Sequence, residues 1–196
     1  MPERHLAAKV YINRVDAQYP QVEGLPGKAV ENHINNLIKV QVHDLVPRLV
    51  GEEMEVFLKS VVEVNKKSVF SIRTEVYKYI HRHANGTTVV RSLTVDLETG
   101  KVYRLHDLFK PGSRYVEVLS EMIRQQIEEQ KIPLIKEFHK IRPNQSYYLT
   151  EYALIIYFQE LKYTPHYVGV PEFAIPFTSI LNLVSERGPI AKLLDP

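Results

Sequence analysis

The chain has 196 residues, of which 44% are hydrophobic and 24% charged, enough apolar material for the core of one domain or two small ones. Its formal net charge is +2, and Lys66-Lys67 is the only adjacent basic pair, so no strong field favours nucleic acid as a partner. Because the sequence has no cysteine, disulfides, thiolate catalysis and cysteine-ligated zinc are excluded.

Targeting signals are not evident in the sequence. No apolar run approaches the ~18 residues of a membrane-spanning helix, and the N-terminus lacks the hydrophobic core of a signal peptide. The chain as it stands is therefore predicted to be cytoplasmic, with no membrane span. If a signal or anchor has been removed upstream of Ala7, the expected location is extracytoplasmic.

The N-terminal part predicts a strand followed by a long helix. Residues 6–15 are mostly apolar and β-prone, and Tyr19-Pro20 is expected to end this strand. Apolar residues at helical spacing predict an amphipathic helix from Ala29 to about Leu49. The stripe expected to face the core consists of Val30, Ile34, Leu37, Ile38 and Leu45.

An antiparallel meander is predicted next. Residues 55–64 and 69–81 have strand character and are joined by a turn at residues 65–68. Asn85-Gly86 is the strongest hairpin signal, because both residues tolerate positive φ, and residues 87–97 form the partner strand. Residues 98–100 predict a further turn, with Gly100 suited to the left-handed position, before residues 101–105 return.

The C-terminal part predicts further helices and a second hairpin. Ser113 is expected to cap a helix that runs to Gln130, and a second helical piece is expected over residues 134–140. A hairpin over residues 147–158, an irregular loop, a short strand, a short helix over residues 176–184 and a tail from Gly188 follow. Helices segregated from antiparallel strands indicate the α+β class, here an antiparallel β meander packed by two main amphipathic helices. This arrangement allows two small lobes, over residues 1–90 and 91–196.

Three patterns occur in a fixed order along almost the whole chain. The first is Tyr19-Pro20 followed by the helix with Ile34-Asn35, and the second is LTVDLETGKVYRLHDLF at residues 93–109. The third runs from Tyr148-Leu149-Thr150 through Tyr157-Phe158 and continues with Tyr163, Pro165, Tyr167, Gly169 and Ile175-Pro176. The ordered set resembles the extracytoplasmic region of the RsiV-type anti-sigma factors and the non-catalytic N-terminal part of PdaC-type peptidoglycan deacetylases.

The resemblance implies a bacterial, RsiV-like or PdaC-like binding module of the cell envelope. In the anti-sigma factors the resembling region is a sensor that binds lysozyme and thereby becomes exposed to proteolysis. In the deacetylases it accompanies a catalytic domain without supplying catalytic residues. This chain lacks a recognisable sigma-factor-binding segment, and no two of its histidines are four apart, as the deacetylase metal site requires. The expected partner is a protein or a peptidoglycan-related ligand, and no nucleic acid.

The residues expected to bind this ligand lie in the loop after the second hairpin. Tyr163, Pro165, His166, Tyr167 and Gly169 fall within seven residues, a density that predicts a rigid binding loop. We predict Tyr163, His166 and Tyr167 as its contact residues. The alternative is that these tyrosines pack internally and that His166 caps the loop from inside.

Evidence for an enzyme is weak in this sequence. His81 and His83, two apart on a predicted strand, would share a face and could chelate a metal, with His106 and Asp107 as further ligands if the hairpins align. The preferred interpretation is exposed polar residues at the end of a strand, because an open metal site normally needs three protein ligands and the sequence fixes two. No nucleophile elbow or phosphate loop is present, and the spacing of the carboxylates requires no acid–base pair. We therefore predict a non-enzymatic module without catalytic residues, metal or cofactor. A metal-assisted cell-wall hydrolase and a ligand-free accessory domain stay open as alternatives.

Overall fold

The computed structural model describes residues 7–12, 15–46 and 54–195. It contains eight strands in two sheets, with α-helices and short 3₁₀ turns between them. The fold is α+β, as the sequence predicts, and the predicted antiparallel meander is present in both sheets. Among the described residues, no helix combines the length and the apolar character needed to cross a membrane.

The first sheet has five strands in the order β1-β2-β3-β4-β5. Its strands are β1 (Ala7–Ile12), β2 (Val15–Pro20), β3 (Met54–Lys66), β4 (Val69–Ile80) and β5 (Thr87–Asp96). All neighbours are antiparallel except β2 and β3, which are parallel and are joined through helix α1 (Lys28–Leu45). A parallel pair requires such a crossover, because a tight turn can join only strands that run in opposite directions.

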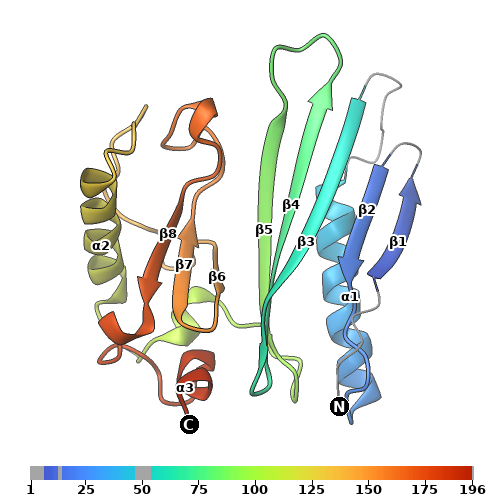
Figure 1. The fold of residues 1–196 in the computed structure, drawn as a ribbon. Coiled ribbons are helices and arrows are strands. Elements are labelled where there is room, and N and C mark those ends of the chain that lie inside the picture. Colours follow the sequence, from blue (N-terminus) through green and yellow to red (C-terminus); the bar gives the residue numbers. More distant parts are fainter. Residues whose placement is uncertain (1–6, 13–14, 47–53, 196) are drawn as a thin grey trace.

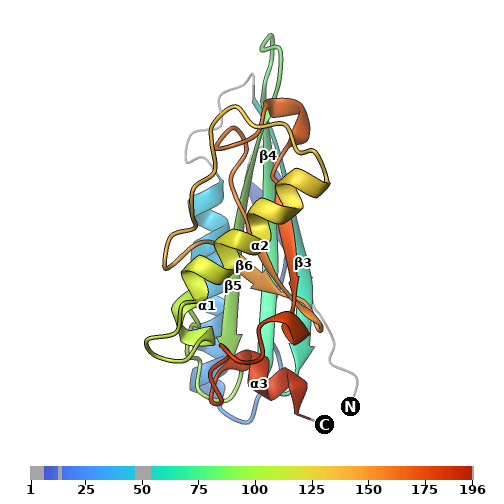
Figure 2. The ribbon, with the colours of Figure 1, turned by 90° about the vertical axis from the view of Figure 1, so that its left-hand side faces the viewer.

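The second sheet has three antiparallel strands, β6 (Tyr147–Leu149), β7 (Ala153–Tyr157) and β8 (Glu172–Pro176). Helix α2 (Tyr115–Glu129) lies against its outer face, and the short helix α3 (Pro189–Leu194) lies near the end of β5 (Figures 1 and 2). The two sheets thus lie between α1 on one side and α2 on the other. Strand β5 spans residue 90, and the predicted division into two lobes there stays a prediction.

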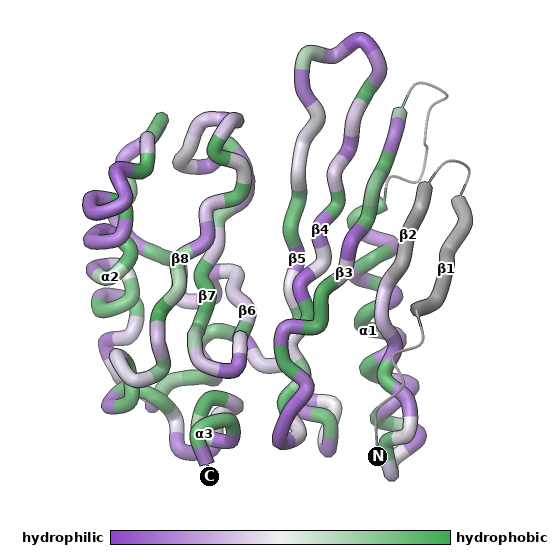
Figure 3. Tube along the Cα trace, viewed as in Figure 1, coloured by the Kyte–Doolittle hydropathy of each residue, from purple (hydrophilic) through white to green (hydrophobic). Residues whose placement is uncertain are grey.

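Successive side chains along each strand point to opposite faces of its sheet and therefore contribute to different hydrophobic cores. Under α1, the core contains Ile34 and Ile38 of the helix with Phe70, Ile72 and Val76 of β4. Under α2, alternate residues of β7 and β8 join a larger core with Leu119 and Ile123; these are Leu154, Ile156, Phe173 and Ile175. The remaining residues of β7, Ile155 and Tyr157, face the first sheet and meet Val90 and Tyr148. In Figure 3, hydrophobic residues recur along α1 and β3, whereas the β4–β5 tip is mostly hydrophilic.

Several predicted elements in the first half are wrong in detail. The single strand expected over residues 6–15 is instead the hairpin of β1 and β2, so Tyr19-Pro20 belongs to a strand. The helix α1 ends at Leu45, and Leu49, its expected last residue, lies outside the described residues. The β4–β5 connection is a six-residue loop in which Gly86 does not have positive φ. A Cβ at position 86 would lie 2.3 Å from the end of the Tyr77 ring, so another residue there would require this exposed side chain to move.

The second half also departs from three expectations. Ser113 does not cap α2, whose N-cap is Arg114, and the Ser113 hydroxyl is buried with no partner among the described residues. Residues 134–140 form an irregular segment in place of the expected helix. Only the 3₁₀ turn Phe177–Ser179 occurs in the region 176–184, and the last helix, α3, falls in the expected tail.

Candidate functional site

The loop between β7 and β8, residues 158–171, contains the predicted binding residues. Tyr163 is half-buried and packs edge-on against two phenylalanines. The ring centroids lie 5.5 Å from Phe138 and 4.9 Å from Phe158, with interplanar angles of 83° and 81°. Such edge-to-face pairs contribute about 0.5–1.5 kcal/mol beyond the area that they bury. Tyr163 therefore anchors the loop to the α2 core and is not one of its exposed residues.

Two polar residues at the start of the loop attach it to the first sheet. The Gln159 side chain donates to the Val90 carbonyl oxygen at 2.7 Å and accepts from the Val90 N–H at 3.0 Å. The Glu160 carboxylate accepts a hydrogen bond from the Thr88 N–H at 2.6 Å. These side chains form hydrogen bonds with backbone groups of the edge strand β5 that would otherwise need another strand or water as a partner. Neither residue was predicted from the sequence, although two polar side chains directly after a buried strand are a signal that could have identified them.

The predicted contact residue His166 has an internal partner. Its Nδ1 meets the Glu160 carboxylate, whose side chain is only 4% exposed, while the imidazole itself is 39% exposed. One turn further on, Gly169 has φ of +72°, a conformation that other residues rarely adopt. One edge of His166 therefore fixes the loop, and the rest of its ring remains accessible.

Tyr167 is the exposed residue of the loop. It lies in the 3₁₀ turn His166–Val168 and is 80% exposed. The loop thus holds Tyr163 inward, His166 at its side and Tyr167 outward. A large aromatic side chain that is held outward by a fixed loop suits recognition, because little conformational entropy is lost when it binds.

Further exposed aromatic residues lie on strands β3 and β4 of the first sheet. Phe57 and Tyr77 pair across β3 and β4, are 53% and 37% exposed, and have ring centroids 6.4 Å apart. Tyr77 is also opposite Thr88, the residue that donates to Glu160. Strands β3 to β5 extend beyond the second sheet at this end of the molecule (Figure 1). We call Phe57, Tyr77 and Tyr167 together the aromatic surface.

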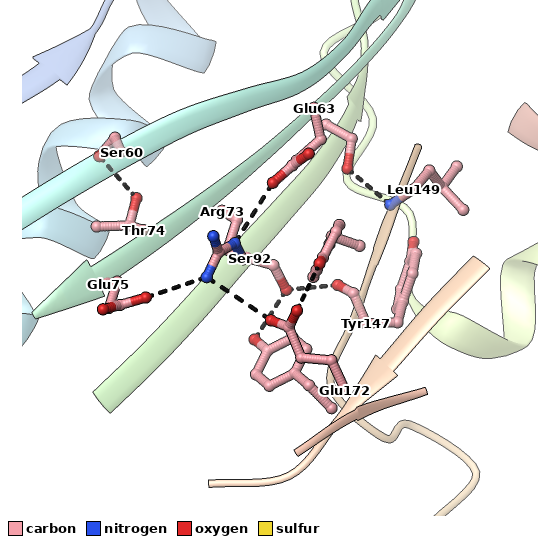
Figure 4. Close-up of polar contacts among 12 residues, drawn as sticks. Ser60, Glu63, Arg73, Thr74, Glu75, Ser92, Tyr147, Leu149 and Glu172 are labelled. Atoms are coloured by element: carbon pink, nitrogen blue, oxygen red, sulfur yellow. Dashed lines mark hydrogen bonds and ion pairs between the residues drawn. The ribbon is translucent and has the colours of Figure 1, made fainter. Parts of the chain in front are cut away.

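A polar cluster lies between the two sheets, in addition to the apolar contact of Val90 with Ile155 and Tyr157. Arg73 of β4 faces Glu63 of β3 at 3.4 Å, Glu75 at 3.1 Å and Glu172 of β8 at 3.6 Å (Figure 4). The Arg73 guanidinium also lies 5.8 Å from the centroid of the Tyr148 ring. Burial raises the pKa of Tyr148, and the neighbouring Glu172 raises it further, so its phenol stays a hydrogen-bond donor to Glu172. This polar cluster joins the sheets and was not predicted.

The C-terminal part of the chain matches a known family. The family model of DUF3298, described as a protein of unknown function, matches residues 106–178. This part of the chain is thus similar to the DUF3298 family. The loop with Tyr163, His166 and Tyr167 lies within the matched residues, whereas His81, His83 and β3 to β5 lie outside them.

Similarity to a known protein extends along more of the chain. The chain is 29% identical over 193 residues to the anti-sigma-V factor RsiV of Bacillus subtilis, a match that covers 88% of this chain and 66% of that protein. The chain thus spans just under two thirds of the length of this relative. Together with the DUF3298 match, this similarity confirms the predicted resemblance to RsiV-type proteins.

Two solved structures share the fold. A DUF3298 family protein of Pseudomonas aeruginosa superposes with a TM-score of 0.68 and 14% identity, over 100% of this chain and 97% of that one. A DUF3298 family member of Bacteroides fragilis gives a TM-score of 0.66 and 16% identity, over 92% and 87% of the two chains. At these identities the likeness concerns the fold.

The histidines considered as metal ligands do not form a cluster. Strand β4 ends at Ile80, so His81 and His83 lie in the following loop and do not have the strand geometry that was expected. The His81 Nε2 pairs with Glu55 at 3.0 Å, and the His106 Nδ1 pairs with Asn144 at 2.6 Å. Within the described ranges, no three histidine or carboxylate side chains gather as a metal would require.

The most strongly bound carboxylate of the described residues is Asp96. It is buried and accepts hydrogen bonds from the Tyr103 hydroxyl at 2.9 Å and from the Lys192 ammonium at 2.6 Å. Its other oxygen accepts from the Glu98 and Thr99 N–H groups. Burial alone would raise the pKa of Asp96, but the bonds from Lys192 and Tyr103 outweigh it and lower the pKa to about 2. A carboxylate with four donors and no free lone pair is suited to fixing α3 and not to proton transfer.

Proposed function

We propose that this protein is a non-enzymatic, extracytoplasmic binding or sensing module that recognises a cell-envelope-related protein of the lysozyme type. The observation that carries the proposal is the outward Tyr167, 80% exposed on a loop fixed by Gln159, Glu160 and Tyr163. Similarity to an anti-sigma factor, a regulatory protein, supports a protein as the partner.

The aromatic surface is the proposed contact area. Tyr167 and the accessible edge of His166 would contact the partner, Phe57 and Tyr77 would extend the contact onto the sheet, and Tyr163 would hold the loop in position. Aromatic side chains are enriched among the residues that dominate binding energy at protein interfaces. The partner is therefore expected to present a largely apolar patch to this end of the molecule.

A titration of the chain against a c-type lysozyme tests this proposal. Muropeptide fragments are titrated in parallel, and both series are repeated with added zinc. We expect saturable, metal-independent binding of the lysozyme. Binding of the muropeptides alone would replace the protein partner by a glycan, turnover that requires zinc would contradict the non-enzymatic assignment, and no binding in any series would overturn the proposed partner.

Matched tyrosine variants locate the contact. Tyr167→Ala should weaken lysozyme binding at least tenfold, because it removes the central exposed aromatic side chain. Tyr152→Ala is the control: Tyr152 is 78% exposed but lies in the β6–β7 turn, at the opposite end of the second sheet. Equal losses in the two variants would show that the loop is not the contact site.

A further inference from the structure

Strand β5 forms one edge of the first sheet, and its outward backbone groups are covered in an uneven way. Alternate residues of β5 direct their N–H and C=O groups away from β4. At one end, the Thr88 N–H donates to the Glu160 side chain, and both backbone groups of Val90 bond to the Gln159 side chain. At the other end, the Thr94 carbonyl oxygen accepts from the Tyr103 N–H, and both backbone groups of Asp96 bond to residues 100 and 101.

Ser92 lies between these two covered ends. Its N–H and its C=O both point outward, and neither has a partner in the part of the chain that the structure describes. Its hydroxyl, in contrast, is fully used, since it contacts the Tyr147 carbonyl oxygen and the Tyr157 hydroxyl. At Ser92 the edge of β5 thus presents a donor and an acceptor side by side, the pair that one more extended residue would complete.

A pocket of about 330 Å³ opens at this point. It is lined by residues of β5, of the segment 102–105 and of the segment before β6. The charged and polar residues of the lining include Arg91, Arg104, Asn144, Ser146 and Tyr157. The pocket lining contains no aspartate or glutamate. Neither Arg91 nor Arg104 forms an ion pair with any described residue, so both guanidinium groups are available to an anion.

We propose that this pocket binds the C-terminal end of a peptide. One extended residue near the end of the peptide would donate its N–H to the Ser92 carbonyl oxygen and accept from the Ser92 N–H with its own C=O. The terminal carboxylate would then pair with the guanidinium groups of Arg91 and Arg104, for which a planar carboxylate is a suitable partner. The pocket lies near the lower end of the roughly 300–1,000 Å³ typical of ligand sites, which suits the end of a chain better than a long segment.

This site is separate from the aromatic surface. It does not depend on Tyr167, Phe57 or Tyr77, and none of them lines it. The proposal therefore stands or falls independently of the lysozyme-type partner. A peptide with its carboxylate amidated would keep the backbone bonds to Ser92 but would lose the charge that the arginines recognise.

Titration with N-acetyl-Ala-Ala, followed in ¹H–¹⁵N spectra of the whole chain, tests the proposal. We expect saturable shifts of the Ser92 amide, and at least tenfold weaker binding of the C-terminally amidated probe. Equal affinity for the two probes, or shifts that leave Ser92 unchanged, would overturn the assignment. Inorganic phosphate that competes as well as the peptide would reduce the site to a simple anion site and would also contradict it.

Arginine variants provide the second readout. Arg91→Gln and Arg104→Gln should each weaken the binding of N-acetyl-Ala-Ala at least fivefold. The affinity for the C-terminally amidated probe should stay nearly unchanged. Both residues are exposed, so the fold should tolerate these changes. Arg187→Gln, at another exposed arginine outside the pocket, is the matched control and should bind as the unmodified chain does. Unaltered peptide affinity in both pocket variants would contradict the proposal.

Discussion

The two faces of the five-stranded sheet are built from different chemistry. Toward α1, β4 presents Phe70, Ile72 and Val76, all fully buried among apolar side chains. Toward the second sheet, the same strand presents Ser71 and Arg73, both held by hydrogen bonds or ion pairs. Apolar burial is strong but non-directional, whereas hydrogen bonds require a geometry. The comparison teaches that one face stabilises the sheet and the other fixes how the second sheet is placed on it.

The largest effect is expected on the apolar face. Ile72→Ala should lower the free energy of unfolding by about 2–5 kcal/mol, because it removes a fully buried side chain and leaves a cavity under α1. Urea unfolding measures this change. Lys59→Ala, an exposed position on the neighbouring strand, is the control and should change stability by less than about 0.5 kcal/mol. A loss below about 1 kcal/mol for Ile72→Ala would show that the apolar face is not the stabilising one.

The next effect comes from Arg73, the cation of the polar face. Arg73→Leu should cost about 1–3 kcal/mol, since Glu63, Glu75 and Glu172 would then face one another without a positive charge. The double variant Arg73→Leu/Glu172→Leu should recover part of this loss in urea unfolding. If the two losses simply add, the pair is not coupled across the sheets.

Asp96 gives the polar face a pH dependence. The pKa of Asp96 is lowered to about 2 in the folded chain, below the value of about 3.9 for an unfolded aspartate. The ionised carboxylate therefore adds about 2 kcal/mol to the free energy of unfolding, and this contribution is fully present above pH 4. That contribution is lost as the pH falls from 4 toward 2. Unfolding of the unmodified chain and of Asp96→Asn should therefore differ most near neutral pH and converge near pH 2. A constant difference across this range would contradict the assignment.

The smallest effect on stability is expected at Tyr167, the exposed residue of the loop, in contrast to Tyr163, which packs inward. Tyr163→Ala should lower stability by about 1–3 kcal/mol because it removes a ring from the aromatic cluster with Phe138 and Phe158. Tyr167→Ala should change it by less than about 0.5 kcal/mol. Thermal unfolding compares the two, and similar losses would mean that Tyr167 is also a packing residue.

Periodic patterns explain most of what the sequence could predict. Alternation along β4 and β5 and the helical spacing of Ile34 and Ile38 depend on burial of one face, which leaves a direct trace in the residue order. The parallel pairing of β2 with β3 leaves no such trace, because the partners are separated by the whole of α1. Single-residue signals were weaker: Asn85-Gly86 predicts a tight turn, but these residues end a six-residue loop in which Gly86 does not have positive φ.

The candidate site was predictable in part for the same reason. The density of aromatic residues and glycine identified the loop, because such residues mark fixed loops locally. Which of Tyr163 and Tyr167 points inward depends on Phe138, more than twenty positions away in the sequence, and on Phe158. The attachment of Glu160 to Thr88 spans 72 residues, so only the folded chain shows it.

The coverage of the β5 edge also bears on self-association. An exposed strand edge can recruit a strand from another molecule, which leads to aggregation. The side chains of Gln159 and Glu160 at one end and residues 100–103 at the other leave a gap of one residue at Ser92, too short for a further strand to extend along. The same arrangement that leaves room for the end of a peptide therefore protects this edge against strand addition between copies of the chain.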